Sequence, residues 1–501
     1  MTTRALPKLN IGFYALQVAL LMFACFTITI FYTIAWDVLR SYPYAIEYEG
    51  HIFWASHSLS LGKNIYDAAM LSNQNWGVII YNPLYIAIGA CLVKLLGLSY
   101  EPLRLLTMVS TLAAFSGIVV VLINHCKLRH FHAIIALALF ASSLPVFYWS
   151  GVARVDMLGL ALSVWGLERF LSAWNKRAVT ASATPQKRFN WSLVASILLL
   201  VAAFFTKQQY FVFPVSIAIF CFLNSQRKLG TVVLATWAVS VATIVAFIQQ
   251  ISGGYLAHLA YASGLPWEWS TMKQFLFPFL SDYKTIASIS VILLAGFVSR
   301  RKHPHEALAK VLLLISFALC MYTMGLRAAY HNHLICTEIA LYWLAAISLS
   351  KLSGGPSLAV ILAVVLSLNT MQIYFAVLWE RLKILPQTRQ SLKLFKENNF
   401  AGKTILSEDP TLPMLVGAKP SMIDGTTIMN MSAKHPEQIQ ALRDAIAAKR
   451  FNAIIINTAD AEKLNQEIWT EPMVRLIKQN YRLAGRTGGN GLPQSVYFPV
   501  Y

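Results

Sequence analysis

The stretch YAIEYEGHIFWASHSL, from Tyr44 to Leu59, follows a long apolar run over residues 11–36. Its acids, Glu47 and Glu49, stand out because the 501-residue chain has only 22 Asp and Glu residues against 41 Lys and Arg residues. A carboxylate beside lipid is energetically expensive and usually has a function. The stretch therefore predicts a functional site next to a membrane span.

The composition predicts a polytopic membrane protein. Hydrophobic residues make up 57% of the chain and the mean hydropathy is +0.55. Apolar runs recur through the first three quarters, and a helix needs roughly 20 residues to cross a bilayer. The first run follows Arg4 and Lys8 and has no small-residue cleavage pattern. It predicts a retained anchor with a cytoplasmic N-terminus.

The net charge of +19 does not require a nucleic-acid partner. In a multispanning protein, Lys and Arg residues also set the topology. The six cysteines are scattered through apolar segments and form no CxxC pair. This pattern predicts small buried side chains and neither a disulfide framework nor a zinc site.

Eleven spans are expected, and they assign a side of the membrane to each loop. They lie near residues 13–36, 103–124, 132–149, 156–172, 191–206, 208–223, 230–250, 284–299, 308–325, 334–350 and 356–378. This arrangement puts the Lys- and Arg-rich loops inside, as the positive-inside rule requires. A further crossing at residues 81–97 would reverse all later loops, so that segment is expected to be a helix in the outer interface.

The expected domains are a transmembrane domain over residues 1–380 and an extracytoplasmic α/β domain over residues 381–501. The first contains a large outer loop at residues 37–102. In the second, the apolar segments KTILSE, PSMID and FNAIIIN alternate with helical stretches such as HPEQIQALRDAIAAKR. It has no Gly-rich phosphate loop, so nucleotide binding is not expected there.

Four polar clusters fall on the expected outer side of the membrane. They are EYEGH (residues 47–51), ARVD (153–156), KQQ (207–209) and RAAYHNH (327–333). Each also has a simpler explanation. The two acids suit a solvated loop or a first helical turn, Asp156 suits a helix cap, and Lys207 suits a hairpin tip from which it reaches the interface. The HxH pair, His331 and His333, suggests metal binding but does not establish it.

Together, the clusters favour one site with a specific chemistry. A carboxylate can act as general base on an acceptor, while Lys and Arg neutralise a departing phosphate. A hydrophobic groove beside them would hold a lipid tail. This combination suits transfer from a lipid-phosphate donor.

At these residues the chain resembles the GT-C superfamily of polytopic glycosyltransferases, in the branch of the protein O-mannosyltransferases and aminoarabinose transferases. That branch has an acidic motif in its first outer loop, a "G..LY.D" segment, a "PPLYY"-like interfacial helix, an Arg-Pro-Asp-like motif and a Lys-Gln pair. The counterparts here, in the same order, are Glu49-Gly50, GKNIYDA (62–68), YNPLY (81–85), Arg154-Val155-Asp156 and Lys207-Gln208.

The resemblance implies a mainly α GT-C-like fold with about eleven membrane helices, a small α/β domain and an inverting transferase that uses a polyprenyl-phosphate sugar. Glu49 would deprotonate the acceptor, with Glu47 as a helper or metal contact. Lys207 and Arg327 are the candidates for the leaving phosphate. Arg154 and Asp156 would orient Glu49 or line the acceptor path, and the other expected substrate-binding residues are Gln208, Tyr81 and Asn82. The implied partners are the lipid-linked donor and a lipid, glycan or protein acceptor.

Two departures from the pattern matter. Tyr48 occupies the place of the Asp that often precedes the Glu, and Asn82 replaces the first Pro of the interfacial motif. Some relatives bind a divalent metal at the acidic loop, where His331 or His333 would be additional ligands. The alternatives are a multispanning transporter or a non-catalytic envelope-assembly protein. The expected location is the bacterial inner membrane, with the site on its outer face.

Overall fold

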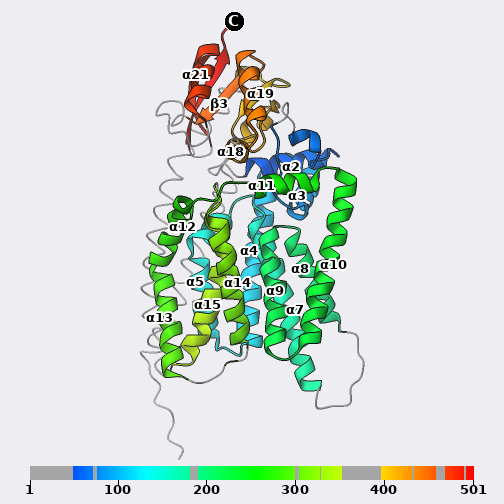
Figure 1. The fold of residues 1–501 in the computed structure, drawn as a ribbon, viewed down its shortest axis with the longest axis vertical. Helices are drawn as coiled ribbons and strands as arrows, with labels where there is room; N and C mark the ends of the chain where they lie inside the picture. Colours follow the sequence, from blue (N-terminus) through cyan, green and yellow to red (C-terminus); the bar gives the residue numbers. More distant parts are fainter. Residues whose placement is uncertain are drawn as a thin grey trace, which may run out of the picture.

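The structure is a computed structural model with a helical part up to residue 352 and an α/β part from residue 397 (Figure 1). We describe residues 49–71, 76–180, 190–299, 303, 305–327, 329–352, 397–431, 434–457, 469–489 and 492–501. The expected spans at 13–36 and 356–378, the boundary at 380/381 and Glu47 lie outside these ranges.

The helical part consists of α-helices joined by short 3-10 or π-helical segments, and their order follows the chain. They are α2 (Gly50–Ser60), η1 (Ala68–Leu71), α3 (Pro83–Leu96), α4 (Glu101–Val120), η2 (Val121–His125), α5 (His130–Ala141), α6 (Leu144–Trp149), α7 (Asp156–Thr180), α8 (Trp191–Phe204), η3 (Gln208–Phe211), α9 (Val212–Leu223), α10 (Arg227–Ser252), α11 (Tyr255–Ser263), α12 (Trp269–Ser281), α13 (Tyr283–Val298), α14 (Glu306–Met324), η4 (His331–Leu334) and α15 (Ile335–Ser350).

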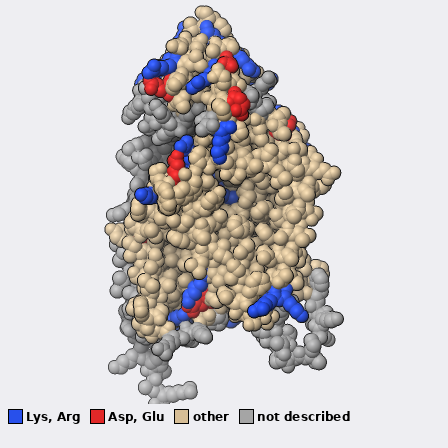
Figure 2. All heavy atoms as spheres, viewed as in Figure 1, with Lys and Arg blue, Asp and Glu red and all other residues tan. Residues whose placement is uncertain are grey.

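Four of the described helical segments are long and apolar enough to cross a membrane. They are α4 with η2, α10, α14, and η4 with α15, and they confirm long apolar helices at four of the predicted spans. The bent pair α12 and α13, with 64° between its halves, would be a fifth. On the face shown in Figure 2, charged residues gather at the two ends and leave an uncharged belt between them.

The other predicted spans are helical but differ in detail. The segment at 132–149 forms two shorter helices, α5 and α6, and α7 runs past its predicted end to Thr180. Helices α8 and α9 are apolar but short. The described residues therefore support a multispanning helical bundle without confirming the count of eleven spans.

Short helices cover the end of the bundle that faces the α/β part (Figure 1). Helix α3 has 14 residues, which at 1.5 Å per residue is about 21 Å and too short to cross a bilayer. Its buried side chains share a hydrophobic cluster with α2, α11 and the α/β residues Met414 and Ile423. The α/β part is therefore packed directly against this end of the bundle.

The α/β part has a five-stranded sheet of order β2-β1-β3-β5-β4. Strands β1 and β3 form where the sequence predicts them, and β1 pairs in parallel with both β2 and β3. Strand β2 is only two residues long, and the antiparallel hairpin of β4 and β5 was not predicted. The elements are β1 (Thr404–Ser407), α17 (Thr411–Leu415), β2 (Lys419–Pro420), α18 (Gly425–Asn430), α19 (Pro436–Ala447), β3 (Ala453–Asn457), α21 (Glu471–Asn480), β4 (Tyr481–Gly489) and β5 (Leu492–Pro499).

Candidate active site

Glu49 lies immediately before α2 and is sealed inside the protein. Its carboxylate forms two hydrogen bonds with Arg104 of α4, from Nε to Oε1 at 3.0 Å and from Nη2 to Oε2 at 2.8 Å. The side chains of Glu49 and Arg104 are 1% and 0% exposed. The backbone N–H of Ala153 also donates to Oε1. The carboxylate thus fastens the start of α2 to α4 and to the ARVD segment.

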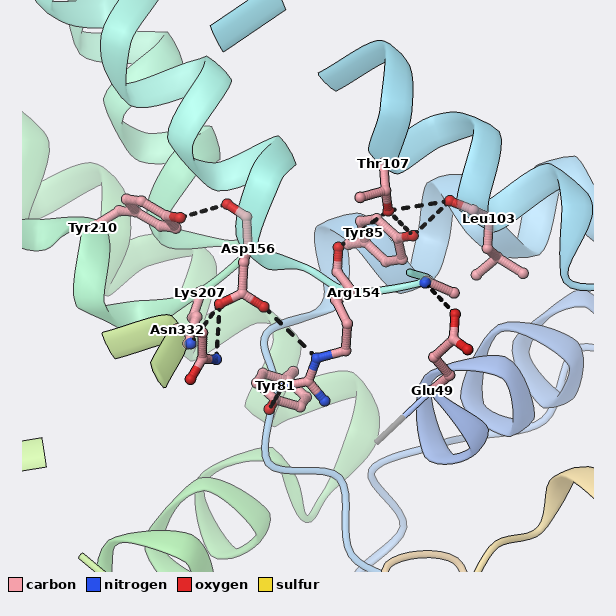
Figure 3. Close-up of polar contacts among 11 residues, drawn as sticks. Glu49, Tyr81, Tyr85, Leu103, Thr107, Arg154, Asp156, Lys207, Tyr210 and Asn332 are labelled. Carbon is pink, nitrogen blue, oxygen red and sulfur yellow. Dashed lines mark hydrogen bonds and ion pairs between the residues drawn. The ribbon is translucent and has the colours of Figure 1, made fainter. Parts of the chain in front are cut away.

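Asp156, the first residue of α7, is the centre of a second buried cluster (Figure 3). Its Oδ1 accepts a hydrogen bond from Lys207 Nζ at 2.7 Å and another from Asn332 Nδ2 at 3.0 Å. Its Oδ2 lies 3.7 Å from Arg154 Nε. Asp156 therefore holds two cations together, and its carboxylate has a larger role than capping α7.

Arg154 points from this cluster toward Tyr81 (Figure 3). Its guanidinium carbon lies 4.9 Å from the centre of the Tyr81 ring, and its Nη2 donates to the Tyr81 hydroxyl. The ring of His51 stacks on Tyr81 with centroids 5.4 Å apart. Burial, assisted by the positive charge of Arg154, holds the pKa of His51 well below its usual value. The imidazole therefore stays neutral at pH 7.

The segment before α3 is fixed against the Lys-Gln segment. Asn82 Nδ2 donates to the carbonyl of Phe204, while its Oδ1 accepts from the Tyr255 hydroxyl, each at 2.5 Å. Gln208 Nε2 donates to the carbonyl of Ile80 at 3.3 Å. Asn82 thus has a structural use in place of the Pro that the resemblance leads one to expect, since its side chain joins three elements.

Several solved structures share this architecture, although no protein-family model and no curated protein sequence matches the chain. One is ArnT from Cupriavidus metallidurans bound to undecaprenyl phosphate, with a TM-score of 0.61 and 10% identity, covering 96% of this chain and 98% of that one. The chain has the GT-C fold. Another GT-C structure, the Archaeoglobus fulgidus oligosaccharyltransferase with Zn and sulfate, matches with a TM-score of 0.55 and 13% identity over 92% of this chain and 71% of that one.

The GT-C fold and the apolar helices together identify an integral membrane protein. Within it, the structure brings together five residues that the sequence analysis singled out for substrate binding. These are Tyr81, Asn82, Arg154, Asp156 and Lys207, and Gln208 lies beside them. Their roles in catalysis and binding remain predictions.

Arg327 lies in a different setting from the one expected of a phosphate ligand. It ion-pairs with Glu268, and the Arg327 side chain is 45% exposed. The hydrogen bond from its backbone N–H to the Pro266 carbonyl, at 2.8 Å, joins the same two loops. In this structure, Arg327 fastens the loop before α12 to the loop before η4.

The metal candidates do not form a recognisable ligand set. Across the described ranges, no group of three or more His, Cys, Asp or Glu side chains converges as metal ligands would. His331 and His333 lie in η4, and the Nδ1 atom of each is buried without a hydrogen-bond partner. These residues alone do not fit a divalent metal.

Two further residues of the site are not among the predicted ones. Arg104 lies inside an apolar run, where an Arg is costly and usually has a partner, so its position in the sequence is a usable signal. Asn332 lies between the two histidines of the RAAYHNH motif. Its bond to Asp156 is what joins that motif to the site.

Proposed function

We propose that this protein is a membrane glycosyltransferase that moves a sugar, with inversion, from a polyprenyl-phosphate donor to an envelope acceptor. The observation that carries the proposal is the buried Arg154–Asp156–Lys207 cluster at one end of an apolar bundle with the GT-C fold. A lipid-linked donor would place its phosphate at this end of the bundle, beside the cluster, and its lipid chain along the apolar helices. ArnT, a protein of similar fold, was solved with undecaprenyl phosphate.

Lys207 and Arg154 are the proposed phosphate ligands. Both side chains are almost fully buried, at 6% and 4% exposed, so their charges act in a medium of low dielectric constant. Asp156 keeps them together before the donor arrives, which lowers the cost of assembling two cations in one place. As the bond from the sugar to phosphate breaks, they would stabilise the charge on the leaving polyprenyl phosphate.

The acceptor hydroxyl or amine would attack the anomeric carbon, forming the new glycosidic bond as the bond to phosphate breaks. Its proton would pass to a carboxylate of the EYEGH motif. Glu49 already accepts three hydrogen bonds, so it would take the proton only after one donor moves away. We therefore propose Glu49 as the first candidate for the base, acting after such a rearrangement, and Glu47 as the second candidate on its place in the sequence.

The proposed location of the site is the extracytoplasmic face. Lys and Arg also gather at the end of the bundle far from the α/β part (Figure 2). That end includes Lys310 and Lys351, which pair with Glu306. Under the positive-inside rule, this supports a cytoplasmic position for that end and an outer position for the site and the α/β domain at 381–501.

The test uses purified full-length protein and a panel of radiolabelled polyprenyl-phosphate sugars, with envelope lipid, glycan and protein fractions as acceptors. We expect acceptor-dependent release of polyprenyl phosphate, reduced at least 100-fold by Lys207→Met. Lys310→Met is the matched control and should behave as wild type. Movement of intact donor across a vesicle membrane without release would instead support the transporter alternative. No reaction with any donor would support the assembly-protein alternative.

A further inference from the structure

The α/β part contacts the helix that begins at Glu49. Gly50, the first residue of α2, lies directly against Asp409 of the α/β part. A Cβ atom at Gly50 would come within 1.7 Å of Asp409 Oδ1 and 2.7 Å of Thr411 Oγ1. Such a close approach is possible only because residue 50 has no side chain. The start of α2 is therefore shaped to accept the segment 409–411.

Asp409 fixes the orientation of the Thr411 side chain. Its Oδ1 accepts the Thr411 backbone N–H at 2.9 Å and the Thr411 hydroxyl at 2.6 Å. The Thr411 oxygen also lies 2.5 Å from the Tyr100 hydroxyl. A threonine hydroxyl can donate only one hydrogen bond, and that of Thr411 is donated to Asp409. The Tyr100 hydroxyl is therefore the donor to Thr411. All three residues are buried.

Tyr100 continues this contact to the Glu49 ion pair. The guanidinium carbon of Arg104 lies 4.7 Å from the centre of the Tyr100 ring. Another neighbour of the ring is Phe53 of α2, stacked with centroids 4.3 Å apart. The ring thus packs against the guanidinium that binds both oxygens of Glu49.

A second contact links the α/β part to the segment that carries Tyr81. Trp76 forms a parallel β-bridge with Met422, and its carbonyl accepts the Ile423 N–H at 3.0 Å. The chain continues from Trp76 to Tyr81, whose hydroxyl contacts Arg154. The α/β part thus contacts both the start of α2, at Glu49, and the segment that leads to Tyr81.

We propose that the Thr411 hydroxyl positions the Glu49 carboxylate, and that it acts through Tyr100 and Arg104. The effect on catalysis rests on the proposed function, whereas the effect on α2 does not. The α/β part then affects the reaction indirectly, since the acidic motif is correctly placed only while segment 409–411 is docked on Gly50. Thr411 is a positioning residue and touches no substrate.

The test compares Thr411→Val, Tyr100→Phe and the double variant in the full-length protein. Thr411→Val keeps the side-chain shape and removes the hydroxyl. Tyr100→Phe removes only the Tyr100–Thr411 hydrogen bond and should lower kcat about five- to tenfold, with KM for the donor unchanged. Thr411→Val also removes the hydrogen bond from the Thr411 hydroxyl to Asp409, so its kcat should fall at least as far. The double variant should be no slower than Thr411→Val, because that variant already removes the contact with Tyr100. Thr411→Ser should restore the wild-type rate.

The control is Tyr481→Phe, which removes a buried hydroxyl of the α/β part in β4, three strands away from β1. The Tyr481 hydroxyl accepts the Phe451 N–H at 3.4 Å, and its loss should leave kcat unchanged. A wild-type kcat for Thr411→Val, an equal loss in Tyr481→Phe, or effects that multiply in the double variant would each overturn the proposal.

Hydrogen exchange of the α2 amides gives a readout that needs no activity. In Thr411→Val and Tyr100→Phe, the amides of residues 50–60 should exchange about five to ten times faster than in wild type, and in Tyr481→Phe they should not. Unchanged α2 exchange in the first two variants would overturn the positioning role. If the wild type transfers no sugar from any donor, the proposed function fails while hydrogen exchange still decides this question.

Discussion

The Glu49–Arg104 pair should be one of the most sensitive points of the molecule. Both charges are withdrawn from water and held by two direct hydrogen bonds. Removing one partner leaves the other charge buried without compensation, which costs about 3–5 kcal/mol. We therefore expect Arg104→Met and Glu49→Leu each to lower the free energy of unfolding by about that amount.

The double variant separates the ion pair from other effects. Replacing both partners by apolar residues removes the uncompensated charge, although the Ala153 N–H loses its acceptor at a cost of about 1–3 kcal/mol. The combined variant should therefore be more stable than either single one. By the usual scaling of unfolding entropy with length, 1 kcal/mol corresponds to about 1 °C in Tm for a chain of this size.

The assay is thermal unfolding of purified protein in one detergent, followed by intrinsic tryptophan fluorescence. Each single variant should unfold about 3–5 °C below wild type, and the double variant about 1–3 °C below it. Single variants at the wild-type Tm, or a double variant as unstable as their effects added together, would refute the description of a sealed ion pair.

Three other perturbations have distinct expected results. Lys207→Met should weaken binding of undecaprenyl phosphate at least tenfold by native mass spectrometry, while Lys310→Met should not, and equal affinities would contradict a phosphate-binding role for Lys207. Gly50→Ala should cost about 1–3 kcal/mol in thermal unfolding because its methyl group would overlap Asp409, and a wild-type Tm would show that the segment moves freely. His51 has a lowered pKa in the folded protein, so the unfolded chain binds more protons below about pH 6.5 and stability falls as pH drops. His51→Phe keeps an aromatic ring against Tyr81 and should reduce the pH dependence of the free energy of unfolding between pH 7 and pH 5 by up to about 1.4 kcal/mol per pH unit. An unchanged pH dependence would contradict this.

The sequence was most informative where a local pattern has one structural meaning. Long apolar runs predicted the helices α4, α10, α14 and α15 because only a helix satisfies its backbone within a bilayer. The short run at residues 81–97 was assigned to the interface from charge balance, and α3 is too short to cross. The GT-C fold was predicted from short motifs because their order along the chain is specific even though each motif is degenerate.

Ion pairs between residues far apart in the sequence could not be predicted from local patterns. Arg327 and Lys207 are both cations beside apolar helices, yet one forms an exposed pair with Glu268 and the other a buried pair with Asp156. Which carboxylate each one meets depends on how the helices pack, and no local pattern contains that information. The same applies to Arg104, whose partner is 55 positions away.

The hairpin of β4 and β5 was a different kind of omission. The sequence TGGNG, residues 487–491, has the Gly and Asn-Gly pattern typical of a tight turn between strands. This local signal is sufficient to predict the hairpin. The approach of segment 409–411 to Gly50 could not have been found in this way, since it joins two regions far apart in the chain.

The contact between Gly50 and Asp409 also has a consequence for the timing of biosynthesis. About 360 residues separate the two, so at about 5–20 residues per second the ribosome needs roughly 20–70 s to go from one to the other. During that interval the acidic motif is already made, but the segment that covers it does not yet exist. A chain truncated before residue 409 would retain the described membrane helices up to α15 but would lack this cover. If such a chain is made, it should enter the membrane with an incomplete site.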